Sequence, residues 1–346
     1  MKHQTTRYGE IPFYKIGTFG NTADAFISKK LFLEYKTKYS FPKKGDILIS
    51  ASGTIGRAVI YDGKPAYFQD SNIVWIDNDE TLVKNDFLFY AYSNVKWNTE
   101  HTTILRLYND NFRNTLIPLP PLNEQIAIAN ILSDLDRYLC ALDALILKKE
   151  SVKKALSFEL LSQRKRLKGF NQAWQRVRLG DIANYLTSNL SAEQITQQGK
   201  IKVYDANNFI GYTDTTFISD KPYISIVKDG SVGRVRILPP KTNILSTMGA
   251  LIANHRTTTE FLFYLLSNFD FKNFTSGSII PHIYFKDYKE KTISLPPLNE
   301  QIAIANILSA LDNEIISLKN KKRQFENIKK ALNHDLMSAK IRVLEK

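Results

Sequence analysis

Residues Leu119–Asp136 read LPPLNEQIAIANILSDLD, and residues Leu295–Asp312 read LPPLNEQIAIANILSALD. The two stretches differ at one position, where Asp134 stands against Ala310, and they lie about half a chain apart in a sequence of 346 residues. A long internal repeat constrains the architecture before any single residue is considered, because each copy belongs to the same structural unit. The sequence therefore predicts two similar units in tandem, each ending in a long helix.

The repeated stretch has the signals of a helix start and of a coiled-coil seam. Prolines end whatever precedes it, Asn123 suits an N-cap, and Glu124 lies in the first turn, where the helix dipole favours an acid. Apolar residues then recur at alternating spacings of four and three. The predicted helix runs from about Asn123 to about Gln163, roughly 60 Å at 1.5 Å per residue, which is too long to pack on its own domain. The second repeat supplies a partner helix. The predicted seam residues are Leu132, Leu135, Leu139, Leu142, Ile146, Leu308, Leu311, Ile315, Leu318 and Phe325.

The rest of each unit has the pattern of a small α+β domain, here called a head. Short β-type runs bounded by Gly, Pro, Asn and Asp precede one short apolar helix in both halves, which predicts a curved sheet rather than a βαβ array. The runs in the first head are 11–16, 46–50, 58–61 and 73–76, with a helix at 87–94. Those in the second are 201–204, 223–227 and 235–238, with a helix at 261–268.

These patterns divide the chain into four segments. Residues 1–118 form the first head, 119–168 the first long helix, 169–294 the second head and 295–346 the second long helix. The second head opens with Trp174–Gln198, which has no counterpart before Tyr8 and Gly9. We therefore expect the first head to lack its opening strand.

The charge of the chain is +13, and most of it lies in two places. Residues 137–170 have nine Lys and Arg against three acids, and residues 313–346 have nine against four. A basic excess indicates a polyanionic partner, but Lys and Arg also favour helices, so both interpretations stay open.

Other compositional features indicate a soluble, cytoplasmic protein without a metal site. No run of eighteen apolar residues and no signal peptide are found, and the single Cys140 excludes an internal disulfide. The five His and one Cys have no zinc-ligand spacing.

Three features together cover nearly the whole chain: the paired Leu-Pro-Pro-Leu-Asn-Glu-Gln segments, WQRVRLGDI at Trp174–Ile182 and the helix end at Leu336–Val343. On these features the chain resembles the specificity subunit of type I restriction-modification enzymes. In that family a Leu-Gly-Asp-Ile-like segment opens both heads. Here it is absent before Gly9, so the first head resembles an N-terminally shortened one.

This resemblance implies a function. Each head would be a target recognition domain that reads one half of a split DNA site. The two helices would pack antiparallel and set the length of the unspecified spacer. Two modification subunits, carrying S-adenosylmethionine, would dock on the chain and methylate adenine, and restriction subunits would join them. The chain itself would be no catalyst and would bind no cofactor.

The turns Gly53–Arg57 and Gly230–Arg234 are the best matched pair of candidate DNA contacts. Small residues let backbone amides approach a phosphate, and Arg can reach a phosphate or the edge of guanine. An ordinary hairpin turn with a solvated Arg is the competing interpretation. Arg106 and His282 stand at matched positions, as different side chains would in heads reading different bases, although drift of an exposed loop gives the same pattern. Tyr108 and Tyr284 are expected in the core. The predicted DNA contacts are Lys43, Lys44, Ser52, Thr54, Arg57, Arg106, Lys228, Ser231, Arg234, Arg236, Ser278 and His282.

The helix-starting segments are also candidates for partner docking. Two copies of one partner need two identical surfaces, although recent duplication would repeat the segments without any partner. The predicted docking residues are Leu119, Pro120, Pro121, Asn123, Glu124, Gln125, Leu295, Pro296, Pro297, Asn299, Glu300 and Gln301.

No catalytic motif is found. The Pro-Pro pairs lack the neighbours of an adenine-methylating loop, and the chain has no phosphate-binding GxxxxGK[ST] motif. The sequence thus predicts a DNA-specificity subunit. The alternative is a non-catalytic assembly scaffold in which one or both heads do not bind DNA.

Overall fold

The computed structural model describes residues 4–68, 72–97 and 106–343, and it divides into two compact units. Unit 1 comprises residues 1–143 and 320–346, and unit 2 comprises residues 144–319. Each unit combines one head with half of each long helix. The four consecutive segments of the sequence are thus regrouped, because a half of each helix packs beside a half of the other.

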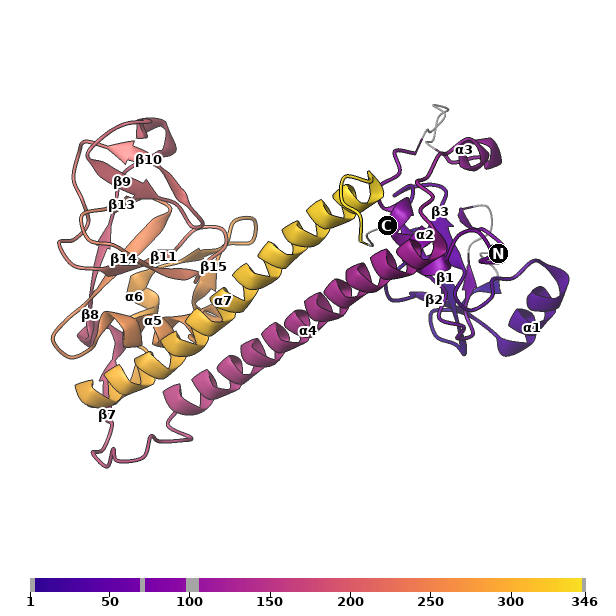
Figure 1. Ribbon diagram of the computed structural model, residues 1–346. Helices are drawn as coiled ribbons and strands as arrows, with labels where there is room; N and C mark the ends of the chain where they lie inside the picture. The colour runs from indigo at the N-terminus through magenta and orange to yellow at the C-terminus, as the bar shows by residue number, and fades with distance from the viewer. Residues whose placement is uncertain (1–3, 69–71, 98–105, 344–346) are drawn as a thin grey trace. The chain divides into compact units, whose positions relative to one another are not determined.

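The two long helices are α4 (Leu122–Leu161) and α7 (Leu298–Met337), each of 40 residues (Figure 1). In unit 1, Asp136 pairs with Lys329 and Asp143 with Lys322. In unit 2, Lys149 pairs with Glu314 and Lys153 with Asp312. Within each unit, the residue numbers of one helix increase in the direction in which those of its paired helix decrease. The antiparallel pair that the resemblance implies is therefore confirmed.

The ten predicted seam residues are all buried or half-buried. Leu132 and Leu308 are fully buried, while Leu142, Ile146 and Ile315 are 5–6% exposed. Val152, farther along α4, is 44% exposed and does not belong to the seam. The helix start also differs slightly, because α4 begins at Leu122 and Asn123 lies inside its first turn.

Ion pairs occupy much of the basic excess. Of the eighteen Lys and Arg in residues 137–170 and 313–346, at least ten pair with acids, and most of those acids lie on the two long helices. The charge of these segments therefore helps to hold the helices together, and it is not a DNA footprint by itself.

The head of unit 1 has two three-stranded sheets. The first has the order β2-β1-β5, formed by β1 (Ile11–Tyr14), β2 (Ala25–Ile27) and β5 (Tyr67–Phe68), with α1 (Lys29–Lys38) after β2. The second has the order β4-β3-β6, formed by β3 (Ile47–Ser50), β4 (Ala58–Ile60) and β6 (Ile73–Trp75). Helices α2 (Asn85–Tyr92) and α3 (Asn109–Arg113) follow.

The head of unit 2 repeats this plan with additions. Its first sheet, β10-β9-β13, joins β9 (Ile201–Tyr204), β10 (Phe209–Thr213) and β13 (Asn243–Ile244). Its second, β12-β11-β14-β8, joins β8 (Ala183–Thr187), β11 (Tyr223–Val227), β12 (Val235–Leu238) and β14 (Met248–Ala253). The remaining elements are β7 (Gln175–Arg178), α5 (Thr259–Ser267), β15 (Thr275–Ser276), β16 (His282–Ile283), α6 (Phe285–Tyr288) and β17 (Thr292–Leu295), with β17 paired to β7 and β15 to β16.

Strand registers establish which elements correspond. In both heads the central strand of the first sheet pairs antiparallel on one side and parallel on the other, as β1 does with β2 and β5, and β9 with β10 and β13. Thr6 and Thr196 make matching isolated bridges to Phe26 and Tyr212. Thr6 of unit 1 thus corresponds to Thr196 of unit 2. Within its described residues, unit 1 has no strand equivalent to β7 or β8.

Each head packs on the long helices through its short apolar helix. In unit 1, Phe87 and Tyr90 of α2 cluster with Ile128 and Leu132 of α4 and with Leu336 of α7. In unit 2, α5 clusters in the same way with Ile304 and Leu308 of α7 and with Leu160 of α4. Small, open sheets and a long helix pair confirm the α+β prediction. Among the described residues, no helix is long and apolar enough to span a bilayer.

Candidate nucleic-acid interface

The predicted turn of unit 1 lies between β3 and β4 and forms a cluster with Arg106. Both Gly53 and Gly56 have positive φ, at 67° and 81°, which explains the need for glycine. Ser52 and Arg106 form an isolated bridge, and both approach Asn72, whose Oδ1 accepts from Ser52 Oγ at 2.8 Å and from Arg106 Nη2 at 3.2 Å. Sequence reasoning missed Asn72, which no motif marks.

The turn of unit 2 lies between β11 and β12 and builds the same frame. Gly230 and Gly233 have φ of 85° and 82°. The counterpart of the Ser52–Arg106 bridge is the Asp229–His282 bridge, in which His282 Nδ1 lies 2.7 Å from Asp229 Oδ1. Equivalent backbone positions therefore hold a hydroxyl and a guanidinium in one head and a carboxylate and an imidazole in the other. Asp229 too escaped the sequence analysis.

Several of the residues predicted to contact DNA surround these two bridges, and their side chains differ in solvent exposure. Arg57 and Arg234 are exposed, and Arg57 Nη1 donates to Phe19 O at 2.9 Å. Thr54, Ser231 and Ser278 are exposed, and Lys228 is half-buried. Ser52 is only 8% exposed and its hydroxyl is used within the head. Its hydroxyl therefore orients Asn72, which also accepts from Arg106.

Other predicted residues lie elsewhere. Lys43 and Lys44 precede β3, at the end of the β3–β4 hairpin opposite the turn, and Lys43 Nζ pairs with Asp77 at 3.0 Å. This partner raises the pKa of Lys43. Arg236 lies on β12, with its guanidinium over the ring of Tyr204 at 5.1 Å and donating to Asn207 O at 2.9 Å. The fold does not bring these three residues into the clusters around the bridges.

The core placement expected for Tyr108 and Tyr284 is wrong. Their side chains are 41% and 49% exposed, each two residues after the bridging Arg106 or His282. The rings of His282 and Tyr284 stack with centroids 6.4 Å apart. Ile279 and Ile280, in the β15–β16 turn, are 93% and 54% exposed. Unit 2 thus presents aromatic and apolar side chains beside the bridge.

The candidate docking residues divide into two classes. Glu124, Gln125, Glu300 and Gln301 are at most 4% exposed, and they bond within the chain, so a docked partner cannot reach them. Leu295 is 5% exposed and Pro296 is buried. Of the other predicted docking residues, Pro120 and Pro297 are half-buried. Leu119, Pro121, Asn123 and Asn299 are exposed.

The buried Gln of each repeat joins the head to the helix. Gln301 Oε1 accepts from Thr257 Oγ1 and the Thr258 amide at 2.9 and 3.1 Å, and its Nε2 donates to Arg256 O and Pro296 O at 2.9 and 2.8 Å. Gln125 does the same with the Lys84 amide, Leu82 O and Pro120 O at 2.8, 3.0 and 2.8 Å. The repeated sequence is therefore explained in part by a repeated internal joint.

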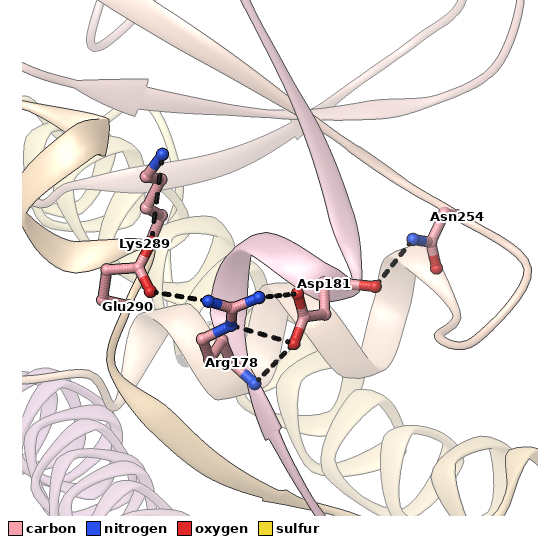
Figure 2. A network of polar contacts seen from close by, with 5 residues as sticks. All are labelled: Arg178, Asp181, Asn254, Lys289 and Glu290. Carbon is pink, nitrogen blue, oxygen red and sulfur yellow. Dashed lines mark hydrogen bonds and ion pairs between the residues drawn. The ribbon is translucent and has the colours of Figure 1, made fainter.

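The opening segment of unit 2 forms a polar network that fixes its path (Figure 2). The Arg178 guanidinium contacts the Asp181 carboxylate and Glu290 Oε2, the latter at 3.0 Å, while Asn254 Nδ2 donates to Asp181 O at 3.0 Å. The hydrogen bond from Arg178 lowers the pKa of the Asp181 carboxyl. This explains why the Leu-Gly-Asp-Ile segment is structural, since its carboxylate is used inside the head.

Comparisons with known proteins identify the family. The model for the "Type I restriction modification DNA specificity domain" matches residues 1–150 and again 171–327. A putative type I restriction enzyme MjaX specificity subunit of Methanocaldococcus jannaschii is 28% identical over 336 residues, covering 86% of this chain and 79% of that protein. A putative specificity subunit of Haemophilus influenzae, S.HindORF215P, is 65% identical over 133 residues, which span 38% of this chain and 34% of that protein.

Two solved structures have a fold similar to that of this chain. The S subunit of a type I restriction-modification system from M. genitalium superposes with a TM-score of 0.63 at 21% identity, over 97% of this chain and 91% of that one. A chain from a structure of type I system assembly and conformational transition gives a TM-score of 0.55 at 14% identity, over 94% and 91%. Since the family model matches both heads and most of both helices, the chain belongs to the family of type I restriction-modification DNA specificity domains, which consists of non-catalytic specificity subunits.

Proposed function

We propose that this chain gives a type I restriction-modification complex its DNA sequence specificity, with each head reading one half of a split site. The single observation that carries this proposal is the matched pair of bridges. The two heads share one backbone frame but hold Ser52 and Arg106 in the first and Asp229 and His282 in the second. Two heads that read different half-sites with the same geometry need a common backbone frame and different polar side chains.

The chemistry around the bridges suits the two components of DNA recognition. The exposed guanidiniums of Arg57 and Arg234 can neutralise phosphates, which gives affinity that falls steeply with salt. The His282 imidazole, the Arg106 guanidinium and the exposed hydroxyls of Thr54 and Ser231 can reach the hydrogen-bonding edges of bases in the major groove, which gives specificity. In this proposal Tyr108 and Tyr284, both exposed, add contact area beside those polar groups.

Modification subunits are the proposed partners of the helix starts. Leu122 and Ile126 of α4 are 38% and 46% exposed, and their counterparts Leu298 and Ile302 of α7 are 45% and 49% exposed. Matched apolar pairs beside exposed Asn123 and Asn299 suit two copies of one partner. We propose that these are two modification subunits, that they bind the S-adenosylmethionine, and that restriction subunits join this assembly. Work on chromosomal DNA would place the complex in the cytoplasm.

One observation favours the alternative of a scaffold that does not bind DNA through both heads. At least ten basic residues of the charged segments are used in ion pairs, so the net charge alone gives little support for DNA binding. Under this alternative the head with fewer strands, in unit 1, would assemble but not read a sequence.

The experiment is to co-express the chain with its modification subunit and to map methylated adenines on genomic DNA. His282→Ala should change one half of the methylated motif and leave the other half unchanged, and Arg106→Ala should do the converse. Lys43→Ala is the matched control, because Lys43 lies at the far end of the hairpin from the turn. A motif insensitive to both substitutions would reject the proposed bridges, and a motif with one half only would support the scaffold role for one head.

A further inference from the structure

The backbone around His282 is held on both sides by the β11–β12 turn. The Ile283 amide, which follows it, donates to Lys228 O at 2.9 Å. On the other side, the Gly230 amide donates to Pro281 O, also at 2.9 Å. The imidazole is therefore attached to a fixed point of the frame, and a group attached in this way keeps its orientation toward a ligand.

The imidazole ring is itself oriented by its neighbours. Nδ1 of His282 lies 2.7 Å from Asp229 Oδ1, and the ring stacks against that of Tyr284 with centroids 6.4 Å apart. A Cβ at Gly277 would lie 3.0 Å from His282 Cδ2, so glycine leaves the edge of the ring beside Nε2 uncrowded. The His282 side chain is 35% exposed, and it is thus fixed within the head and still open to a ligand.

The carboxylate decides which ring nitrogen carries the proton. An ionised carboxylate only accepts hydrogen bonds, so Nδ1 of His282 must donate to Asp229. A neutral imidazole has a single N–H, which leaves a lone pair and no hydrogen on Nε2. Among the described residues, the head uses only Nδ1 of this ring in a hydrogen bond. Nε2 is therefore an acceptor that the head leaves for a ligand.

The equivalent bridge of unit 1 has the opposite hydrogen-bonding character. Arg106 stands there in the place of His282, and a guanidinium has donors and no acceptor. In the major groove, guanine O6 and N7 accept hydrogen bonds, whereas the exocyclic amino groups of adenine (N6) and cytosine (N4) donate them. The two heads therefore suit base edges of opposite character on one backbone frame.

We propose that His282 reads the exocyclic amino group of a base, adenine N6 or cytosine N4, with Nε2 as the acceptor. In this assignment Asp229 is a positioning residue that fixes the tautomer of the ring. Its second oxygen also accepts only, so the pair offers no donor to a ring N7 or a carbonyl oxygen. The inference rests on the proposed function, because it specifies the chemical group that the head of unit 2 recognises.

The probe is a duplex with the mapped motif, bound by the chain in complex with its modification subunit. Binding is measured at about pH 8, above the range in which imidazole side chains change charge. Each amino-bearing base of the half-site read by unit 2 is replaced in turn, adenine by purine, which lacks N6, and cytosine by 2-pyrimidinone, which lacks N4. One replacement should weaken binding by the wild type about tenfold and cause no further loss in His282→Ala. The replacement that does so distinguishes adenine from cytosine.

The matched control is the 7-deaza analogue of each purine, which removes the acceptor N7. In the half-site read by unit 2, its effect should be the same in the wild type and in His282→Ala. In the other half-site, one such analogue should weaken the wild type more than Arg106→Ala, because a guanidinium donates to N7.

Asp229→Asn tests the positioning role. An amide can donate as well as accept, so the imidazole can then take either tautomer. Removal of the amino group should therefore cost less affinity in Asp229→Asn than in the wild type, and one 7-deaza analogue should now weaken binding. A merely structural role would lower the affinity for every duplex by the same factor, and that result would overturn the assignment of Asp229.

The failure of this inference differs from the failure of the proposed function. Coupling of His282 to N7 and not to an amino group would overturn the inference and leave the DNA-reading role intact. An unchanged motif and affinity in His282→Ala would overturn both. If His282→Ala does not fold, the analogue scan on the wild type still decides, because a wild type that tolerates the removal of every amino group would overturn the inference.

Discussion

The Glu124 carboxylate accepts two hydrogen bonds from the Arg342 guanidinium, at 2.9 and 2.8 Å. Their counterparts in unit 2 are Glu300 and Arg166, joined by contacts of 3.2 and 2.6 Å, with Trp174 Nε1 donating to the same carboxylate at 2.9 Å. In each unit a Glu in the first turn of one long helix is therefore clamped by an Arg that follows the end of the other. The repeat encodes both ends of an antiparallel pair.

This clamp predicts a pH dependence for unit 1. The hydrogen bond from Arg342 lowers the pKa of Glu124, so the folded state binds its proton less readily than the unfolded state does. The stabilisation is present above the unfolded pKa, about 4.3, and is lost as the pH falls through the folded value. Chemical denaturation of wild type and Glu124→Gln at pH 7 and at acid pH tests this. The stability difference should shrink on acidification, and a constant difference would contradict the assignment.

The buried Gln301 should be essential to the joint between head and helix. Gln301→Ala leaves the Thr258 amide and two carbonyls without their partner, which should cost about 2–3 kcal/mol in the free energy of unfolding. Urea denaturation provides the measurement. Asn306→Ala, at an exposed position five residues farther along the same helix, is the control and should change stability by less than about 0.5 kcal/mol.

Shortening a buried side chain of the seam should destabilise the protein as it would in a packed core. Leu132 is fully buried against α2 and α7, so Leu132→Ala should destabilise unit 1 by about 3 kcal/mol through lost burial and a residual cavity. Leu147, on the same helix, is 64% exposed, and Leu147→Ala should be nearly neutral. Equal effects in thermal denaturation would mean that the two helices do not pack through this seam.

Arg234 should contribute to DNA affinity. Arg234→Ala removes an exposed charge beside the Asp229–His282 bridge, so duplex binding should weaken, and the slope of log affinity against log salt should fall by about one if the contact is to a phosphate. Arg176→Ala is a matched control, since Arg176 is exposed on β7, in a different sheet. Fluorescence anisotropy over a salt series distinguishes them, and indistinguishable curves would exclude Arg234 from the interface.

The helices should set the spacer of the split site. Deleting one heptad from each helix at facing positions keeps the seam in phase and removes about 10 Å, or roughly three base pairs of rise. Methylome mapping should then show a shorter spacer between unchanged half-sites. Altered half-site sequences would contradict a modular division between reading and spacing.

Much of the fold was predictable because it depends on local patterns. Strands β9, β11 and β12 occupy the residues expected from their β-branched runs, and the seam from Leu132 to Ile146 follows the spacing of four and three. Strand β14 and helix α1 were not predicted, since strand pairing and packing, rather than sequence period, stabilise them. The candidate site was half predictable. Glycine marked the turns, but Asn72 reaches its turn only through long-range contacts, and the pairing of Asp229 with His282 is also long-range.

The sequence by itself determined the duplication, the two long helices and their seam, because periodicity and repetition are properties of the chain alone. The tertiary structure decided what the repeated residues do. Glu124 and Gln125 stand in a segment that resembled a docking surface, yet both are buried, since their partners Arg342 and Lys84 come from distant parts of the chain. It also showed that β6 pairs only with β3 among the described strands, because only strand pairing defines an edge.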